Sequence, residues 1–160
     1  MNDAEILQRL SELSIELPEP PTAVAAYVPV RIAGNVAYVA GQVPLIEGRV
    51  MHPGRSGDPD SDLGPDDVSA AARQAALQAL SALREALGGS FERLAGISMV
   101  TVFIATAPGF GEHPQVANGA SDLLVQVLGD EGRHARAAVG IASLPLGASV
   151  EVAVVAALHG

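Results

Sequence analysis

Hydrophobic and polar positions alternate most regularly near the end of the chain, between residues 134 and 158. The alternation stops at the segment LPLGAS, where proline and glycine favour a turn, and then resumes, which predicts strand, turn and strand. With a period of two, the first strand places on one face Arg136, Ala138, Gly140 and Ala142. The second strand places Glu151 with Ala153 and Val155, and Val150, Val152 and Val154 opposite. One cation and one carboxylate therefore project from faces that are otherwise small and apolar.

Two longer segments show the apolar repeat of three to four residues that is typical of amphipathic helices. The first spans about residues 66–87 and the second about residues 114–128, and glycine follows each of them. Their apolar stripes contain Ala72, Ala75, Ala76, Ala79, Leu80, Leu83 and Leu87 in the first, and Val116, Ala120, Leu123, Leu124, Val127 and Leu128 in the second. A shorter repeat at residues 3–13 predicts a third helix, with Asp3 as its N-cap.

Further strands are predicted by β-branched residues and by a lack of charge. They cover residues 23–32, which include Tyr27, and residues 36–44 and 97–105, and a further short strand can lie within residues 43–51. Gly34-Asn35 predicts a hairpin between the first two strands. Residues 47–65 are rich in glycine, proline and aspartate, which predicts an irregular loop.

The order of these elements predicts an α+β fold, a mixed β-sheet covered on one face by two α-helices. We expect residues 1–19 to form an N-terminal helical extension and residues 20–160 to form a single domain.

The composition is apolar for a chain of 160 residues, with 49% hydrophobic and 17% charged residues. This balance suggests that part of the surface is buried against other subunits. The chain has no cysteine, which excludes disulfides, thiolate nucleophiles and thiolate metal sites. Apolar runs are too short for a membrane helix and no signal-peptide pattern is present, so we expect a cytoplasmic protein with no membrane partner.

All nine basic residues are arginine, and the net charge is −9. The lack of lysine excludes a Schiff-base lysine, a Walker lysine and a pyridoxal-phosphate anchor. Scattered arginines on an acidic chain are a poor match for a phosphate backbone, so we expect no nucleic-acid partner. The four histidines have no mutual ligand spacing, and the D-x-D-x-D run at residues 58–62 lacks the glycine and distal glutamate of a calcium loop. We therefore expect no metal and no cofactor.

Four residues remain as candidates for chemistry, namely Arg136, Glu151, Tyr27 and Asn118. A guanidinium matches a carboxylate with two parallel hydrogen bonds, so Arg136 suits an amino-acid-like or keto-acid-like ligand. A glutamate on an apolar face, such as Glu151, can exchange protons with a water. Arg136 and Glu151 could instead form a structural ion pair at a subunit interface. Tyr27 could simply pack against the sheet, and Asn118 could be a surface residue of its helix.

The segment ARAAVGIASLP followed by VEV resembles the closing signature of the RidA (YjgF) family, several members of which are 2-imino-acid deaminases. The resemblance includes VAYVAGQVP at residues 36–44 and covers roughly residues 20–157. It implies the chorismate-mutase-like fold of the family and a homotrimer with pockets between its subunits. It also implies a carboxylate-binding role for Arg136, a water-orienting role for Glu151, and pocket positions for Tyr27 and Asn118.

Three positions depart from the family pattern. Ala40 stands where many members have a pocket serine, Ala138 where some have a cysteine, and His134 where proline is usual. The first hypothesis is hydrolytic deamination of reactive 2-imino or enamine acids. The alternative is a trimeric protein that binds a keto acid or another small carboxylate without turnover. A third interpretation, an endoribonuclease, is disfavoured by the acidic chain and the absence of lysine.

Overall fold

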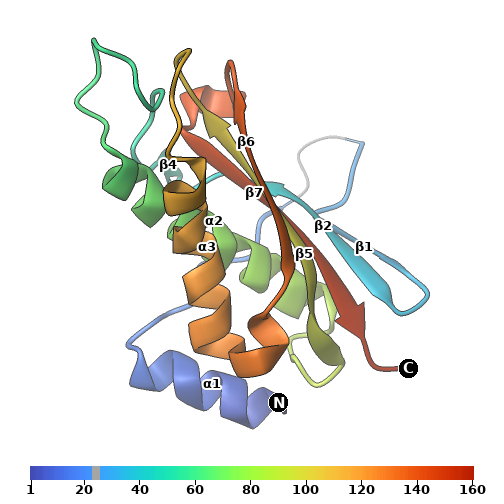
Figure 1. Cartoon of the computed structure of the whole chain (residues 1–160). Coiled ribbons are helices and arrows are strands. Elements are labelled where there is room, and N and C mark those ends of the chain that lie inside the picture. Colours follow the sequence, from blue (N-terminus) through green and yellow to red (C-terminus); the bar gives the residue numbers. More distant parts are fainter. Residues whose placement is uncertain (23–25) are drawn as a thin grey trace.

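The computed structural model describes residues 1–22 and 26–160. Its helices are α1 (Asp3–Glu12), α2 (Pro65–Ala86) and α3 (His113–Leu128), with short 3-10 turns η1 (Gly129–Gly132) and η2 (Pro145–Gly147). Its strands are β1 (Val30–Ala33), β2 (Val36–Gln42), β3 (Leu45–Ile46), β4 (Arg49–Val50), β5 (Leu94–Ala105), β6 (Ala135–Ile141) and β7 (Val150–Leu158). Figure 1 shows the path of the chain through these elements.

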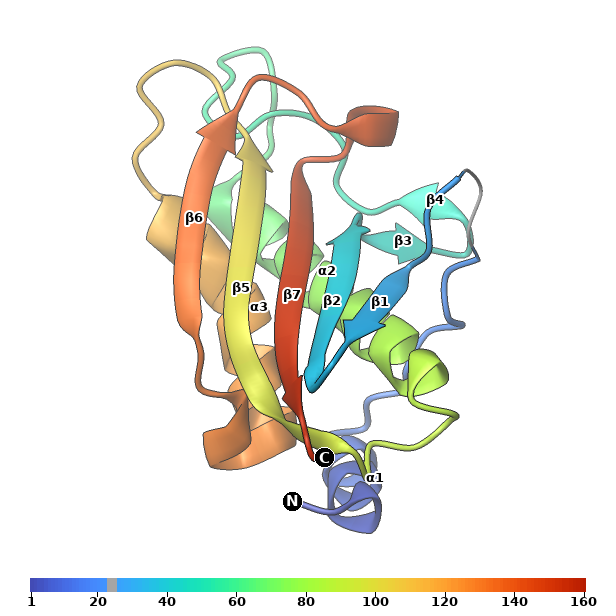
Figure 2. The same ribbon diagram turned by 90° about the vertical axis from the view of Figure 1, so that its right-hand side faces the viewer.

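Five strands form one sheet in the order β1-β2-β7-β5-β6, in which β5 and β6 are parallel and the other pairs antiparallel. Helices α2 and α3 lie on one face, and Figure 2 shows the other face of the sheet, which none of the described helices or strands covers. The predicted α+β fold, a mixed sheet with two helices on one face, is thus confirmed. We call the uncovered side the open face and the opposite side the helix face.

Small residues allow α2 to lie close to its neighbours, because alanine adds only a methyl group to the helix surface. Its buried face contains Ala71, Ala72, Ala75, Ala76 and Ala79. At the crossing with α3, a Cβ on Gly119 would stand 1.9 Å from the carbonyl oxygen of Ser69. Glycine is therefore required at this position for the two helices to pack as they do.

The start of the first strand differs from the prediction. Residues 23–25 lie outside the described residues, and the regular ladder begins only at Val30, after the bends that contain Tyr27 and Pro29. Proline has no N–H to donate to a ladder, whereas its carbonyl still accepts a hydrogen bond of 2.8 Å from the N–H of Ala40. Tyr27 therefore lies before β1 rather than on it.

The predicted hairpin at Gly34-Asn35 is confirmed, with Ala33 and Val36 as the last pair before the turn. The loop over residues 47–65 contains only the two residues of β4, which pair with β3 as a separate two-stranded sheet. Isolated bridges join Pro53 to Ala148 and Ser56 to Thr106. These bridges fasten the loop across the end of β5 and the turn before β7.

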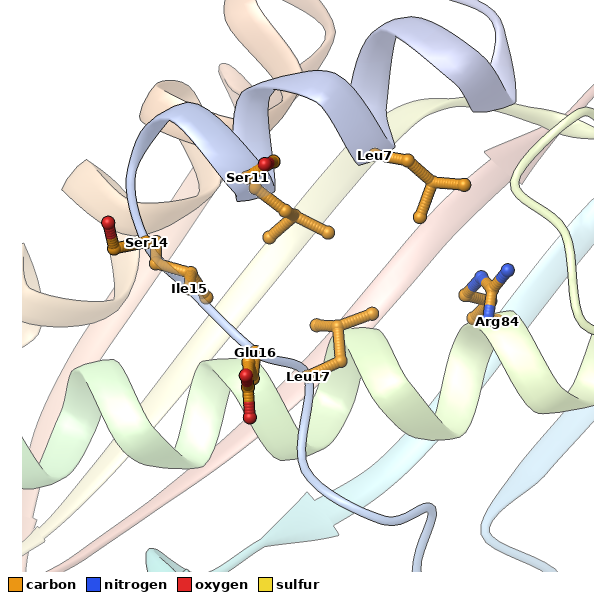
Figure 3. A pocket seen from close by; sticks show the side chains of 8 residues that line it. Leu7, Ser11, Ser14, Ile15, Glu16, Leu17 and Arg84 are labelled. Atoms are coloured by element: carbon orange, nitrogen blue, oxygen red, sulfur yellow. The ribbon is translucent and has the colours of Figure 1, made fainter.

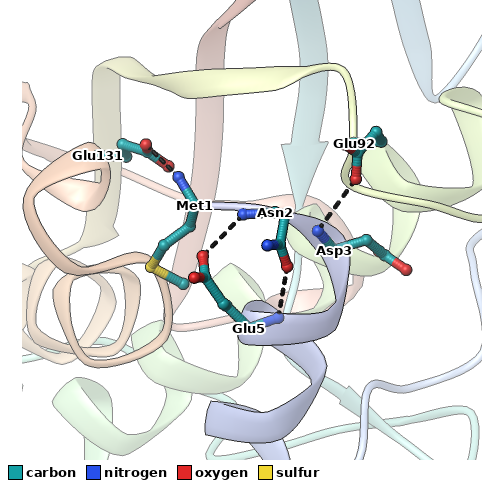
Figure 4. Close-up of polar contacts among 6 residues, drawn as sticks. All are labelled: Met1, Asn2, Asp3, Glu5, Glu92 and Glu131. Carbon is teal, nitrogen blue, oxygen red and sulfur yellow. Dashed lines mark hydrogen bonds and ion pairs between the residues drawn. The ribbon is translucent and has the colours of Figure 1, made fainter.

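Helix α1 is present as predicted, but its cap is a different residue. The side chain of Asn2 accepts a hydrogen bond of 2.9 Å from the N–H of Glu5, and the Glu5 carboxylate accepts one from the N–H of Asn2 (Figure 4). Asp3, which we expected to be the cap, instead accepts a hydrogen bond of 2.7 Å from the N–H of Phe91. The boundary between extension and domain at residue 19 stays a prediction.

Two further contacts fasten α1 to the rest of the chain. The amino group of Met1 contacts the carboxylate of Glu131 (Figure 4). The side chains of Ile6 and Leu10 are buried. None of the described helices is long and apolar enough to span a bilayer.

Candidate functional site

Arg136 lies on β6, an edge strand of the sheet, and its side chain is on the helix face. In the parallel ladder, Arg136 is paired with Val100 of β5, whose fully buried side chain packs under the helices. Residues paired across a ladder point to the same side of a sheet. The arginine therefore extends toward α3, as the alternation in the sequence allowed but could not specify.

Two side chains of α3 hold one end of the Arg136 guanidinium. Nη1 donates hydrogen bonds to Oδ1 of Asn118 at 2.9 Å and to Oγ of Ser121 at 3.1 Å. Nη1 carries two hydrogens, and both are used in this way. Within the described part of the chain, neither Nε nor Nη2 has a hydrogen-bond partner. These two nitrogens form the edge of the guanidinium that binds a carboxylate with two parallel hydrogen bonds.

Ser121 is in turn linked to His134, the residue directly after η1 and Arg133. Oγ of Ser121 lies 3.0 Å from Nε2 of His134, and Nδ1 of the same ring lies 2.6 Å from the carbonyl oxygen of Gly132. Ser121 was not among the residues predicted from the sequence, although it is three residues after Asn118 and so on the same side of α3. His134 was noted only as a departure from the family pattern.

Glu151 lies on β7 with its side chain on the open face. Its neighbours Val150 and Val152 are buried against the helices, and side chains alternate along a strand. Burial raises the pKa of the Glu151 carboxyl above its ordinary value of 4.5. In the described residues, no hydrogen bond or ion pair to this carboxylate offsets that desolvation.

A β-bulge in β2 makes room for the Glu151 side chain. Val39 is paired with Val154 and Gln42 with Val152, so β2 has one residue more than β7 between these pairs. The extra residue falls at Ala40-Gly41, and a Cβ on Gly41 would stand 1.9 Å from Oε1 of Glu151. The glycine therefore allows the carboxyl group to lie against the backbone of β2.

Arg136 and Glu151 lie on opposite faces of the sheet, so they cannot form an ion pair or a common pocket within one chain. The ion pairs found in residues 1–22 and 26–160 involve other groups. A structural pair between two copies of the chain stays a prediction. The same is true of the roles assigned to Tyr27 and Asn118, although Asn118 does contact Arg136.

Tyr27 is about half exposed in its own chain. Its side chain is 53% exposed in the segment before β1. It is thus available to a ligand or to another copy of the chain, and nothing in the described residues brings it to Arg136.

The hollows of the surface do not all coincide with these residues. One hollow, of about 460 Å³, lies between α1 and α2, where Leu7 and Leu17 face Arg84 (Figure 3), and it contains none of the predicted site residues. A smaller hollow of about 240 Å³ lies beside Arg136 and is lined also by Ser121, Val125, Arg133 and His134. Among the described residues, no group of three or more histidine, aspartate or glutamate side chains could hold a metal ion.

A mixed sheet with two helices on one face, an edge-strand arginine held at one end and a half-buried glutamate on the open face together define a class of small, single-sheet α+β protein. Residues 7–158 match the family described as "YjgF/chorismate_mutase-like, putative endoribonuclease". The chain belongs to this family, the YjgF or RidA family, which confirms the resemblance found in the sequence.

Several relatives share most of their length with the chain. Protein TCP17 of Trypanosoma cruzi is 40% identical over 148 residues, which are 92% of this chain and 90% of that protein. The crystal structure of Atu1372 from Agrobacterium tumefaciens, a protein of unknown function, has a TM-score of 0.89 and 39% identity, with 98% of this chain and 94% of that chain covered. RidA from the Antarctic bacterium Psychrobacter sp. PAMC 21119 is 26% identical, with a TM-score of 0.55 and coverage of 87% and 94%.

Proposed function

We propose that the protein hydrolyses 2-imino acids, or related imines that carry a carboxylate, to 2-keto acids and ammonia. The observation that carries this proposal is the hydrogen bonding of the Arg136 guanidinium. Asn118 and Ser121 hold Nη1, whereas Nε and Nη2 have no hydrogen-bond partner in the described residues. A guanidinium fixed at one end presents its other edge without further loss of side-chain freedom. A planar carboxylate is the group that fits this edge best.

Glu151 would supply the proton transfer. Imine hydrolysis adds water to the C=N carbon and then expels the nitrogen as ammonia, so a proton moves from the water to the nitrogen. An ionised Glu151 can accept the proton of the attacking water and return it to the departing nitrogen. A carboxyl whose pKa is raised by burial is a better base for this step than an exposed one.

The two residues can serve one ligand only if they come from different copies of the chain. Each lies on its own face of the sheet, and the open face carries exposed apolar side chains, including Tyr38 at 50% and Val139 at 41%. Covering this face with a second copy removes apolar surface from water. We therefore propose a homotrimer with each site between two copies, in which Arg136 and Asn118 of one copy face Glu151 of the next.

The proposal is tested by adding the purified protein to an amino-acid oxidase or dehydratase that releases 2-imino acids, and by following keto-acid formation. The protein at micromolar concentration should accelerate this step, and Arg136→Ala should abolish the acceleration. Arg55→Ala is the matched control, because Arg55 is paired with Asp58 and has no hydrogen bond or ion pair with Arg136 or Glu151 in the described residues. No acceleration over buffer for several imino acids would refute deamination.

A second candidate is binding of keto acids or other short carboxylates without turnover. Ala40 favours it, because an alanine in the bulge beside Glu151 supplies no hydroxyl to orient a water or a ligand. In this case a keto acid should still raise the melting temperature of the wild-type protein, and Arg136→Ala should remove that shift. Keto-acid binding without any acceleration of imine hydrolysis would support this candidate over deamination.

Endoribonuclease activity, which the family description mentions, is not our proposal for this chain. A net charge of −9 and the absence of lysine oppose binding to a phosphate backbone. RNA cleavage that follows the protein through repeated purification and that is lost in Arg136→Ala would contradict this view.

A further inference from the structure

The hydrogen bonds that begin at Arg136 continue to His134, and their directions follow from the groups involved. The carbonyl oxygen of Gly132 can only accept, so Nδ1 of His134 must carry the hydrogen that joins them at 2.6 Å. In the neutral ring, Nε2 is then an acceptor, and the hydroxyl of Ser121 donates to it across 3.0 Å. Oγ of Ser121 in turn accepts from Nη1 of Arg136.

Protonation of His134 changes this series of hydrogen bonds at one point, the bond between His134 and Ser121. A proton on Nε2 turns the ring into a donor toward Ser121, whose oxygen then accepts from both His134 and Arg136. The hydroxyl hydrogen of Ser121 no longer has an acceptor in the ring, and it can rotate toward the hollow that Ser121 and Arg136 line together. One proton thus adds a hydrogen-bond donor and a positive charge beside the guanidinium.

We propose that Ser121 and His134 are positioning residues for Arg136, and that protonation of His134 turns the Ser121 hydroxyl toward the carboxylate of the ligand. This inference rests on the proposed function, because it assumes a carboxylate at Arg136. Asn118 holds the same nitrogen but has no titratable neighbour in the chain of bonds. Ser121 and His134 therefore make ligand affinity depend on pH, whereas Asn118 does not.

The charged groups that face His134 are mainly cationic. Arg133 and Arg136 line the same hollow, and Arg133 is paired with Asp130 at 3.2 Å. From α3, only the neutral side chains of Ser121 and Val125 line the hollow. A bound carboxylate places a negative charge among these cations, which favours the protonated ring. By linkage, proton uptake by His134 and carboxylate binding strengthen each other by the same factor.

The experiment measures the Kd of 2-oxobutanoate by calorimetry between about pH 5.5 and about pH 8, within which imidazole side chains commonly change their charge. The keto acid is ionised throughout this range. All measurements use the full chain with Glu151→Gln, which removes the titration of that carboxyl. The variants added to this background are His134→Gln, whose amide oxygen can accept from Ser121 without titrating, Ser121→Ala, and Ser121→Thr, which keeps the hydroxyl.

With His134 and Ser121 intact, we expect Kd to rise about three- to tenfold from the acidic to the alkaline end of the range. His134→Gln should make Kd independent of pH. Ser121→Ala should weaken binding throughout and flatten the pH dependence, and Ser121→Thr should restore both. Equal pH dependence with and without His134, or an unchanged Kd in Ser121→Ala, would overturn the inference.

A measurement without ligand separates this inference from the proposed function. Nitrogen chemical shifts of the His134 ring in the free protein should show the hydrogen on Nδ1. The opposite tautomer would overturn the hydrogen-bond chain even if 2-oxobutanoate binds. If the wild-type protein binds no keto acid at all, the proposed function fails, and the ligand role of Ser121 and His134 fails with it.

Discussion

The carboxyl group of Glu151 occupies the space beside Gly41 in which a side chain at residue 41 would lie. A Cβ at residue 41 would stand 1.9 Å from Oε1 and 3.0 Å from Cγ of the glutamate. The contact involves the base of the carboxyl group as well as its end. Any side chain at residue 41 must therefore turn Glu151 to another rotamer. The position of the proposed proton-transfer group depends on this glycine in a neighbouring strand.

The first prediction follows from this contact. Gly41→Ala should lower kcat for imine hydrolysis by about tenfold or more, because a misplaced base loses most of its effect on a proton transfer. Binding of 2-oxobutanoate through Arg136 should remain within about threefold of wild type. Gly111→Ala is the matched control, since a Cβ there meets no atom within 4 Å. Equal losses of binding and turnover in Gly41→Ala would contradict the separate role of Glu151.

The second prediction concerns the origin of the two site residues. Arg136→Ala and Glu151→Gln should each be inactive alone, yet subunits of the two variants that are unfolded and refolded together should regain activity. In a cyclic trimer assembled at random from equal amounts, about one quarter of the sites combine an intact Arg136 with an intact Glu151. Recovery near that fraction is the expected result of the rate assay. No recovery, although mass spectrometry detects mixed trimers, would refute a site shared between two copies.

The third prediction separates charge from shape at Arg136. Arg136→Lys should weaken binding of 2-oxobutanoate by about tenfold or more, because an ammonium cannot bind Asn118 and Ser121 and also present a planar fork. Calorimetry measures the loss. Arg55→Lys, in the pair with Asp58, should bind as wild type does. Wild-type affinity in Arg136→Lys would mean that charge alone holds the ligand.

The fourth prediction uses the raised pKa of Glu151. A carboxyl whose pKa is higher in the folded than in the unfolded chain binds its proton more tightly when folded, so stability falls as pH rises from the ordinary value of 4.5 to the raised value. Glu151→Gln removes this loss. The melting temperature of Glu151→Gln relative to wild type should therefore increase across that interval and be constant above it. A difference that does not change with pH would show that folding leaves the carboxyl unshifted.

The fifth prediction tests how firmly α1 is part of the fold. Ile6 is fully buried and the adjacent Leu7 is 39% exposed. Ile6→Ala should lower the free energy of unfolding by about 2–4 kcal/mol, whereas Leu7→Ala should cost less than about 1 kcal/mol. Chemical denaturation measures both. Similar small effects of the two changes would mean that α1 is only loosely attached and that residues 1–19 form a separate extension.

The elements with a strong apolar period could be predicted from the sequence. The ranges expected for α2 and α3 agree with the structure to within a residue or two, because buried alanine, valine and leucine repeat every three to four positions. The predicted beginning of β1 was wrong. The β-branched residues indicated a strand from residue 23, but Pro29 has no N–H to donate to the ladder, and the strand begins only after it. The predicted N-cap of α1 was also wrong. Asn2 and Asp3 are both residue types that cap helices well, and only the hydrogen bond of Asp3 with Phe91 distinguishes them.

The residues of the candidate site were selected from the sequence and their roles stay predictions, whereas their arrangement could not be predicted. Alternation shows which side chains share a face within one strand, and it correctly separated Arg136 from Val139. It cannot show which face of β6 corresponds to which face of β7, because that depends on the registers with β5. The bulge at Ala40-Gly41 and the bonds from Ser121 to His134 depend on contacts between distant segments, so sequence spacing alone did not reveal them.

Under the proposed function, the placement of Arg136 and Glu151 on opposite faces also makes the rate depend on protein concentration through mass action. If a site needs one residue from each of two copies, an isolated chain contains two halves of different sites and no complete one. Specific activity should then fall when the protein is diluted below the dissociation constant of its assembly, and added ligand, which bridges the halves, should oppose that fall. A simple dilution series of the rate would thus report how strongly the copies associate.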